Sequence, residues 1–223
     1  MWAIVPVKTF DRAKKRLANV LSAEERRALM LAMARDVLTC LSRSQSLAGI
    51  LIVSRAPEAD ALAQAFATER YAESPDTTLA EALEQATQHL ITNFDANGVI
   101  VVPADVPGIA PDELDEILNT HESVTILPDT DKVGTNALIC SPPLAIPYVF
   151  DGQSFKPHVD AAFANNITPK ILPGTRFALD VDLPNDLKEV TQVAPNSQTA
   201  NYLERAGILA RLDSHSQSNS ISD

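Results

Sequence analysis

Continuous runs of apolar residues alternate along the chain with longer segments whose apolar residues recur every three or four positions. The runs at 2–7, 49–54 and 99–102 have the length and composition of buried strands. Segment 22–43 has helical spacing and opens with Ser22 and Glu25 in a capping-box pattern, so we predict a helix there. Similar patterns predict helices at 57–68, 78–92, 111–119, 154–165, 184–191 and 200–212, and short strands at 71–73, 123–128, 136–140, 170–172 and 176–181.

The alternation of strands and helices predicts an α/β protein. Its sheet should be mostly parallel with helices on both faces, because the crossovers between parallel strands cover the sheet. The strands at 123–128 and 136–140 lie too close in sequence for a helical crossover, so we expect an antiparallel pair or a β-arch. The 223 residues contain no evident linker and fit one domain over residues 1–212. Residues 213–223 are polar, and we expect a disordered tail.

Composition narrows the classes of partner. The net charge of −11 argues against binding to nucleic acid. No apolar run approaches the roughly 20 residues of a membrane span, and the N-terminal pattern is not that of a signal peptide. We therefore expect a cytoplasmic protein that does not bind a membrane. Cys40 and Cys140 lie in no metal-binding pattern, so we expect two buried free thiols.

The charge is distributed unevenly along the chain. Residues 1–35 contain eight Lys or Arg against three Asp or Glu. A basic patch on an acidic protein suits a small anionic ligand better than a polyanion. No glycine-rich phosphate motif follows the first strand, so side chains would have to bind the anion; the alternative is a solvated basic surface. The cations that follow this strand are Lys8, Arg12, Lys14, Lys15 and Arg16.

Acidic residues follow two other predicted strands. Asp105 lies just beyond the run at 99–102, and Asp180 and Asp182 stand two positions apart near residue 181. Open α/β sheets bind ligands beyond the carboxyl ends of their strands, and residues two apart in an extended chain face the same side. Three carboxylates at one edge predict a Mg²⁺ site, and Mg²⁺ beside cations indicates phosphoryl or nucleotidyl transfer. Alternatively, Asp105 could form a turn and Asp182 could cap a helix that begins at Pro184.

Several segments match the motifs of a known family in the expected order. They read VPVK, AKKRL, LSAEERRALMLAMARDVL, VIVVPADVPGI, GTNAL, SF followed by His158, and FALDVDLPNDL. Over roughly residues 2–190 the chain resembles the 2-phospho-L-lactate guanylyltransferase family (CofC/FbiD), which is related to the molybdenum-cofactor guanylyltransferases. The resemblance implies a GT-A-like nucleotidyltransferase fold, the fold of nucleotide-diphospho-sugar transferases.

The resemblance also implies an activity. Family members transfer GMP from GTP to a phosphorylated three-carbon acid and release pyrophosphate in the biosynthesis of coenzyme F-420. The acid would be 2-phospho-L-lactate, phosphoenolpyruvate or 3-phospho-D-glycerate. Because the attacking phosphate is already ionised, the reaction needs Mg²⁺ and basic side chains to reduce charge repulsion rather than a general base. A homodimer is compatible with the resemblance, and the sequence does not decide the oligomeric state.

The matching motifs assign roles at the nucleotide end of the site. Lys8 matches a lysine that meets the GTP phosphates, with a role in binding and catalysis. Lys14 and Arg16 match a second basic pair for the nucleotide. The family's metal-binding carboxylates, the first of them catalytic, match Asp105, Asp180 and Asp182.

Two further motifs match the acceptor end of the site. Thr135 and Ser154 match hydroxyl residues near the acceptor phosphate, and Asn136 in the same turn is expected to help position the acceptor. His158 is as consistent with a pocket wall as with a helix face. Two other functions stay open: another small nucleotidyltransferase with a molybdenum-cofactor or sugar-phosphate acceptor, and a non-catalytic nucleotide-binding protein. The presence of all three carboxylates disfavours the second.

Overall fold

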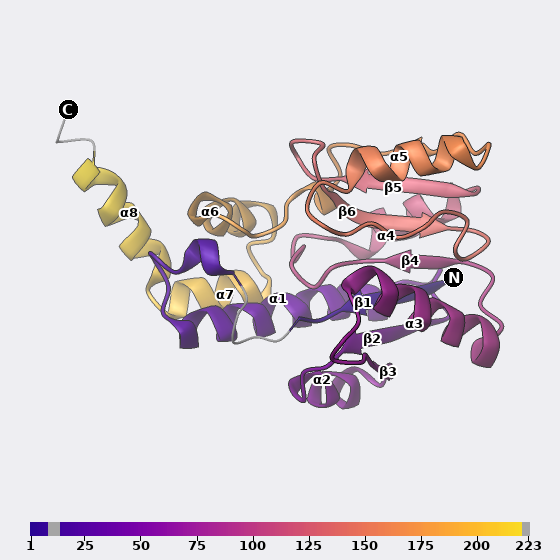
Figure 1. Cartoon of the computed structure of the whole chain (residues 1–223). Coiled ribbons are helices and arrows are strands. Elements are labelled where there is room, and N and C mark those ends of the chain that lie inside the picture. The colour runs from indigo at the N-terminus through magenta and orange to yellow at the C-terminus, as the bar shows by residue number, and fades with distance from the viewer. Residues whose placement is uncertain (9–13, 220–223) are drawn as a thin grey trace.

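The strands form one mixed sheet. The computed structural model describes residues 1–8 and 14–219, and within these a seven-stranded sheet has the order β3-β2-β1-β4-β6-β5-β7 (Figure 1). The strands are β1 (Trp2–Pro6), β2 (Gly49–Ser54), β3 (Glu69–Ala72), β4 (Val99–Val101), β5 (Val124–Pro128), β6 (Thr135–Cys140) and β7 (Lys170–Ile171).

One strand of this sheet runs against its neighbours. β6 pairs antiparallel with both β4 and β5, whereas β1, β2, β3 and β4 pair in parallel and β5 pairs in parallel with β7. A turn of six residues, 129–134, joins β5 to β6, too short for a helical crossover, so the chain must reverse. The prediction of an antiparallel pair is confirmed, and the first residues of β6 lie at the edge where the parallel strands end.

Helices cover both faces of the sheet (Figure 1). Consecutive β1 residues alternate between two apolar clusters: Ala3 and Val5 pack with α1, and Ile4 packs with α3. β1 is therefore buried on both sides, as its continuous apolar pattern predicts. The helices are α1 (Ala23–Arg43), α2 (Glu58–Phe66), α3 (Leu79–Phe94), α4 (Pro111–Asn119), α5 (Phe155–Ala164), α6 (Pro184–Val193), α7 (Gln198–Arg205) and α8 (Ile208–Asn219).

Local capping signals begin two of the long helices. Ser22 and Glu25 form the capping box of α1, and Thr78 and Glu81 form that of α3. Both cysteines are buried free thiols, as predicted. No helix in the described part of the chain is both long and apolar enough to cross a membrane.

α7 docks on α1, beside the part of it that extends away from the sheet, and α6 and α8 pack against α7 (Figure 1). Asp36 of α1 accepts hydrogen bonds from Gln198 N and Thr199 N, both at 2.8 Å, and from Thr199 Oγ1 at 2.6 Å. The carboxylate thus satisfies amides at the start of α7 that have no partner within the helix. The Tyr202 hydroxyl adds a hydrogen bond to the Glu25 carbonyl at 3.1 Å.

Two predicted elements differ from the structure. The strand predicted at 176–181 is a short 3₁₀ turn, η3 (Arg176–Ala178), followed by extended chain, because the Ala178 carbonyl bonds to Thr130 and Asn136 rather than to a neighbouring strand. The helix predicted at 200–212 is divided into α7 and α8 at Gly207, whose φ of 65° favours glycine.

The C-terminal boundary also differs. We predict a disordered tail from residue 213, but α8 continues to Asn219, and Lys188 Nζ donates to Asp213 Oδ1 at 2.5 Å. A polar composition does not by itself prevent a helix that continues from a packed one. Residues 220–223 lie outside the described residues.

Replacing Asp36 with Ala should lower the free energy of unfolding by about 1–2 kcal/mol, because the start of α7 loses its carboxylate partner. Equilibrium unfolding in urea measures the change. Glu204→Ala, at an exposed position of α7, is the control and should shift the free energy by less than about 0.5 kcal/mol. Equal effects of the two substitutions would show that Asp36 does not hold α7.

Candidate active site

A cavity of about 610 Å³ lies at the edge of the sheet where β1 and β4 end. Its wall combines the segments after β1 and β4, the turn before β6, the loop before α5 and the segment before α6. It contains every residue predicted for the site except His158. These wall residues are Lys8, Lys14, Arg16, Asp105, Thr135, Asn136, Ser154, Asp180 and Asp182.

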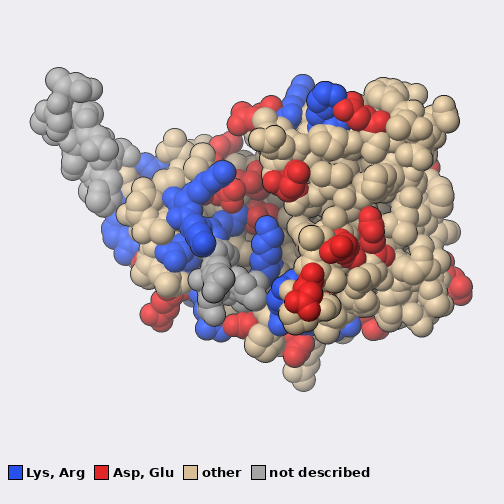
Figure 2. Space-filling view, viewed as in Figure 1, with Lys and Arg blue, Asp and Glu red and all other residues tan. Residues whose placement is uncertain are grey.

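Charges of both signs surround this cavity. Figure 2 shows Lys and Arg side chains on one side of a hollow, facing Asp and Glu side chains across it. Among the cations that follow β1, Lys8 and Arg16 reach the cavity wall, whereas Lys15 is exposed outside it. Arg12 lies outside the described residues.

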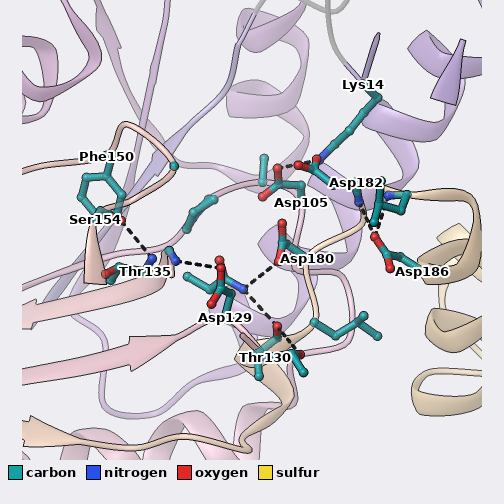
Figure 3. A pocket seen from close by; sticks show the side chains of 18 of the residues that line it. Lys14, Asp105, Asp129, Thr130, Thr135, Phe150, Ser154, Asp180, Asp182 and Asp186 are labelled. Carbon is teal, nitrogen blue, oxygen red and sulfur yellow. Dashed lines mark hydrogen bonds and ion pairs between the residues drawn. The ribbon is translucent and has the colours of Figure 1, made fainter. Parts of the chain in front are cut away.

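Lys14 lies between two of the predicted metal-binding carboxylates. Its Nζ donates to Asp105 Oδ2 at 2.7 Å and to Asp182 Oδ1 at 2.6 Å, and its side chain is only 5% exposed (Figure 3). The Lys14 backbone has φ 51° and ψ 46°, a left-handed conformation that is uncommon for a residue with a Cβ. From the resemblance we predict that Lys14 contacts the nucleotide phosphates, whereas this structure places its ammonium group among the carboxylates.

The ion pairs set the protonation of this cluster. Burial would lower the pKa of Lys14, but Asp105 and Asp182 outweigh it and the pKa is raised. Burial would raise the pKa of Asp105, but Lys14, with a smaller contribution from Lys8, holds it below its usual range. Lys14 and Asp105 are therefore both charged at neutral pH.

No ion pair to Asp180 is found within residues 1–8 and 14–219. Asn136 Nδ2 donates to Asp180 Oδ1 at 3.1 Å and to the Ala178 carbonyl at 3.2 Å. Burial raises the pKa of Asp180; the Asn136 hydrogen bond opposes the rise, and the charges of Asp105 and Asp182 add to it. Asn136, predicted to position the acceptor, thus lies on the cavity wall with its amide group against Asp180. Arg16 Nη1 lies 3.6 Å from Asp182 Oδ2, so Lys14 and Arg16 both pair with carboxylates of this cluster.

The donor chemistry at this edge fits a hard divalent cation, because carboxylate oxygens are the ligands that Mg²⁺ prefers. Among the described residues, however, no three acidic, His or Cys side chains are arranged to hold a metal ion. The Lys14 ammonium stands between two of the three carboxylates. Lys14 would have to leave this position for a metal ion to contact all three.

Backbone contacts bring the two acidic segments together. Val181 N donates to the Asp105 carbonyl at 3.0 Å, so the residues on either side of Val181 lie beside Asp105. The carboxylate of Asp186 accepts from the backbone amides of Asp182 and Leu183 at 2.8 and 2.6 Å, just before α6 begins. Asp186 therefore provides the cap that the alternative interpretation assigns to Asp182, and the Asp182 carboxylate is left to face Lys14.

The residues predicted to bind the acceptor form a second, less charged cluster. Ser154 Oγ accepts from Thr135 N at 2.9 Å, and Thr135 Oγ1 lies 3.0 Å from His158 Nδ1. His158 is fully buried in α5, behind Thr135, and does not line the cavity. Of the two positions that the sequence left open, His158 thus takes the buried face of α5, and its part in acceptor binding stays a prediction.

Sequence reasoning missed Asp129. Its carboxylate accepts from Val133 N at 2.8 Å and from Gly134 N at 2.7 Å, which closes the turn before β6. A Cβ on Gly134 would lie 2.9 Å from Asp129 Oδ2, so a side chain there would displace the carboxylate. The Asp-to-Gly spacing in a polar turn is the only signal in the sequence that could have indicated this role.

Comparisons with known proteins show the family of the chain. A model of the family "Guanylyl transferase CofC like" matches residues 1–221. The chain belongs to this family. The resemblance seen in the sequence motifs is thereby confirmed over a longer part of the chain than the motifs cover.

Curated relatives carry two different activity names. A 2-phospho-L-lactate guanylyltransferase of Methanobrevibacter smithii is 30% identical, over 93% of this chain and 91% of the relative. A phosphoenolpyruvate guanylyltransferase of Roseiflexus sp. is 34% identical, over 91% of this chain and 90% of the relative. The two names differ in the acceptor, so family membership leaves the acid open.

The fold is also found in a solved structure. A protein from Desulfovibrio desulfuricans G20 assigned as a nucleotide-diphospho-sugar transferase superposes with a TM-score of 0.77 at 22% identity, covering 96% of both chains. With the mixed, mostly parallel sheet, this confirms the predicted fold class.

Replacing Lys14 with Met should lower the free energy of unfolding by about 1–3 kcal/mol in buffer free of divalent cations, because Asp105 and Asp182 lose their counter-charge. Thermal or urea unfolding measures the loss. Lys15→Met removes the same charge from an exposed neighbour and should have little effect. If the two variants were equally stable, the Lys14 ion pairs would not contribute to folding.

Proposed function

We propose that this protein transfers GMP from GTP to the phosphate of a small phosphorylated acid and releases pyrophosphate. The observation that carries the proposal is the meeting of Lys8, Lys14 and Arg16 with three aspartates in one cavity of a CofC-like chain. Candidate acceptors are 2-phospho-L-lactate, phosphoenolpyruvate and 3-phospho-D-glycerate. As part of the same proposal, the product would enter the biosynthesis of coenzyme F-420.

The reaction joins two anions, which explains the charges in the site. An oxygen of the acceptor phosphate forms a bond to the α-phosphorus of GTP, and the bond from that phosphorus to the bridging oxygen of pyrophosphate breaks. The attacking oxygen is already ionised, so no side chain has to remove a proton. The main requirement is to reduce repulsion between phosphates, and basic side chains that point into a cavity do this.

Mg²⁺ is the cofactor that we propose, held by Asp105, Asp180 and Asp182. When bound, it would neutralise charge on the phosphate oxygens. The position of all three carboxylates on the wall of one cavity supports this proposal. Lys14 would then exchange its carboxylate partners for phosphate oxygens, which reconciles its observed contacts with the role that the sequence motif implies.

We assign the acceptor to the other end of the cavity, beside Thr135 and Ser154. Hydroxyl residues line this end of the cavity, and Asp129 and Asp131 of the turn at 129–134 also belong to its wall. Neutral donors can bind a carboxylate or a phosphate without competing with the carboxylates for the metal ion. The two ends of the cavity thus offer different chemistry to the two substrates.

Incubation with GTP, Mg²⁺ and each of the three acids should release pyrophosphate with at least one of them. A coupled pyrophosphate assay compares the acids, and parallel reactions with ATP and CTP test the base preference. GTP without an acid is the control and should give no release above background. Absence of release with all three acids would refute the proposed function.

Asp105→Asn should reduce kcat/KM by about 100-fold or more, because the site loses one of its proposed metal-binding charges. Steady-state kinetics measure the loss, and circular dichroism checks that the fold is retained. Asp60→Asn, whose side chain is 72% exposed outside the cavity, should leave kcat/KM unchanged. Near-normal turnover of the Asp105 variant would rule out this role.

A further inference from the structure

His158 is buried beside the cavity and uses both ring nitrogens. Val149 N lies 2.9 Å from Nε2, and Thr135 Oγ1 lies 3.0 Å from Nδ1. A backbone N–H can only donate, so Nε2 must accept and carries no proton. A neutral imidazole has one N–H, which places the proton of His158 on Nδ1.

This tautomer decides the direction of the hydrogen bond to Thr135. Nδ1–H donates, so the Thr135 hydroxyl oxygen accepts and keeps its own hydrogen for another partner. Thr135 lines the cavity, and no second partner of its Oγ1 is found within the described part of the chain. The hydroxyl hydrogen is therefore available to a ligand.

The neutral ring is the form that this environment favours. Burial lowers the pKa of His158 to about 4, although the charge of Asp151 opposes the shift. A protonated ring would set Nε2–H against the Val149 N–H, two donors facing each other. The hydrogen-bond geometry and the burial thus agree on one protonation state.

Thr135 is held by both its backbone and its side chain. Ser154 Oγ accepts from Thr135 N at 2.9 Å, and His158 N donates to the Ser154 carbonyl at 3.0 Å in the first turn of α5. The edge of the His158 ring also packs against Phe150, with ring centroids 5.2 Å apart. The hydroxyl group is therefore fixed in place and in donor direction before any ligand arrives.

We propose that His158 is a positioning residue that commits the Thr135 hydroxyl to donate, so that the acceptor end of the cavity selects an anionic oxygen. The ligand group is a phosphate or carboxylate oxygen of the acid, which can accept but not donate. A neutral hydroxyl group of a ligand could either donate to Thr135 or accept from it. Its hydrogen bond to a fixed donor would also be weaker than that of an anionic oxygen. This inference rests on the proposed function, because it concerns the acceptor of that reaction.

Two substitutions of His158 separate positioning from structural support. Gln places its amide group near the former Nε2 and can accept from Val149 N, but it loses the donor to Thr135. Asn places an N–H near the former Nδ1 and keeps that donor, but it loses the acceptor for Val149. If His158 has a purely structural role, both substitutions should raise the KM for the acceptor by similar factors. If His158 positions Thr135, the two KM values should differ.

His158→Gln should raise KM for the acceptor about tenfold or more, with KM for GTP and the melting temperature nearly unchanged. His158→Asn should keep the wild-type acceptor KM even if its melting temperature falls. Steady-state kinetics with each substrate varied, together with thermal unfolding, give these values. Equal acceptor KM values for the two variants, or parallel changes for GTP and the acceptor, would overturn the positioning role.

Thr135 variants extend the test, and together with His158→Asn they keep it decisive if His158→Gln does not fold. Thr135→Val removes the hydroxyl and should raise the acceptor KM, while Thr135→Ser should restore it. In a double-mutant cycle, His158→Asn should leave the effect of Thr135→Val unchanged, whereas His158→Gln should abolish most of it. If the effects of His158→Gln and Thr135→Val on the acceptor KM were additive, the proposal would be contradicted. Wild-type protein without turnover on any acid would instead refute the proposed function itself.

Discussion

The gathering of three carboxylates at one edge of the sheet is the constraint on which the rest of the site depends. Two unit charges about 4 Å apart interact by about 4 kcal/mol near a protein surface, so grouped carboxylates require a cation. Lys14 provides it by bridging Asp105 and Asp182, which lie 91 and 168 positions away in the chain. This contact joins the segment after β1 to the segments after β4 and before α6. The site that we propose for the nucleotide therefore also contains a tertiary contact of the fold.

The reversed strand β6 gives the site its second half. In an all-parallel sheet, only segments that follow strands would lie at the edge formed by the carboxyl ends of the strands. Because β6 runs the other way, its first residues, Thr135 and Asn136, reach the same edge. Asn136 then donates to the Asp180 carboxylate, and Thr135 lines the end of the cavity that we propose for the acceptor. One change of strand direction thus joins the charged and the neutral parts of one cavity.

Much of the fold could be predicted because its signals are local. Ser22 with Glu25 and Thr78 with Glu81 determine where helices begin, and the apolar runs of β1 and β2 are long enough to indicate burial on both faces. The predicted strand at 176–181 failed because a strand needs a partner: the Ala178 carbonyl bonds to Thr130 and Asn136 instead. Strand propensity alone could not reveal that competition.

The site shows the same division between local and long-range information. The predicted residues line one cavity because they follow strand ends, and the topology of the sheet places those ends together. The contacts of Lys14 and the burial of His158 depend on side chains from distant segments, so no pattern within a short window could specify them. Asp182 was ambiguous for a local reason: it stands where a helix cap would, and only the geometry shows that Asp186 has that role.

The turn between β5 and β6 has a consequence for how the family can diversify. Asp129 holds Val133 N and Gly134 N, and Thr130 is anchored to Ala178, so the path of this turn does not depend on the side chains of Asp131 and Val133. We expect these two positions to tolerate mutation while Thr135 stays in place, whereas Lys132, with a φ of 56°, accepts fewer residue types. Substitutions beside the proposed acceptor end can then arise without a change in the backbone of the turn. A turn built in this way separates the evolution of substrate choice from that of folding.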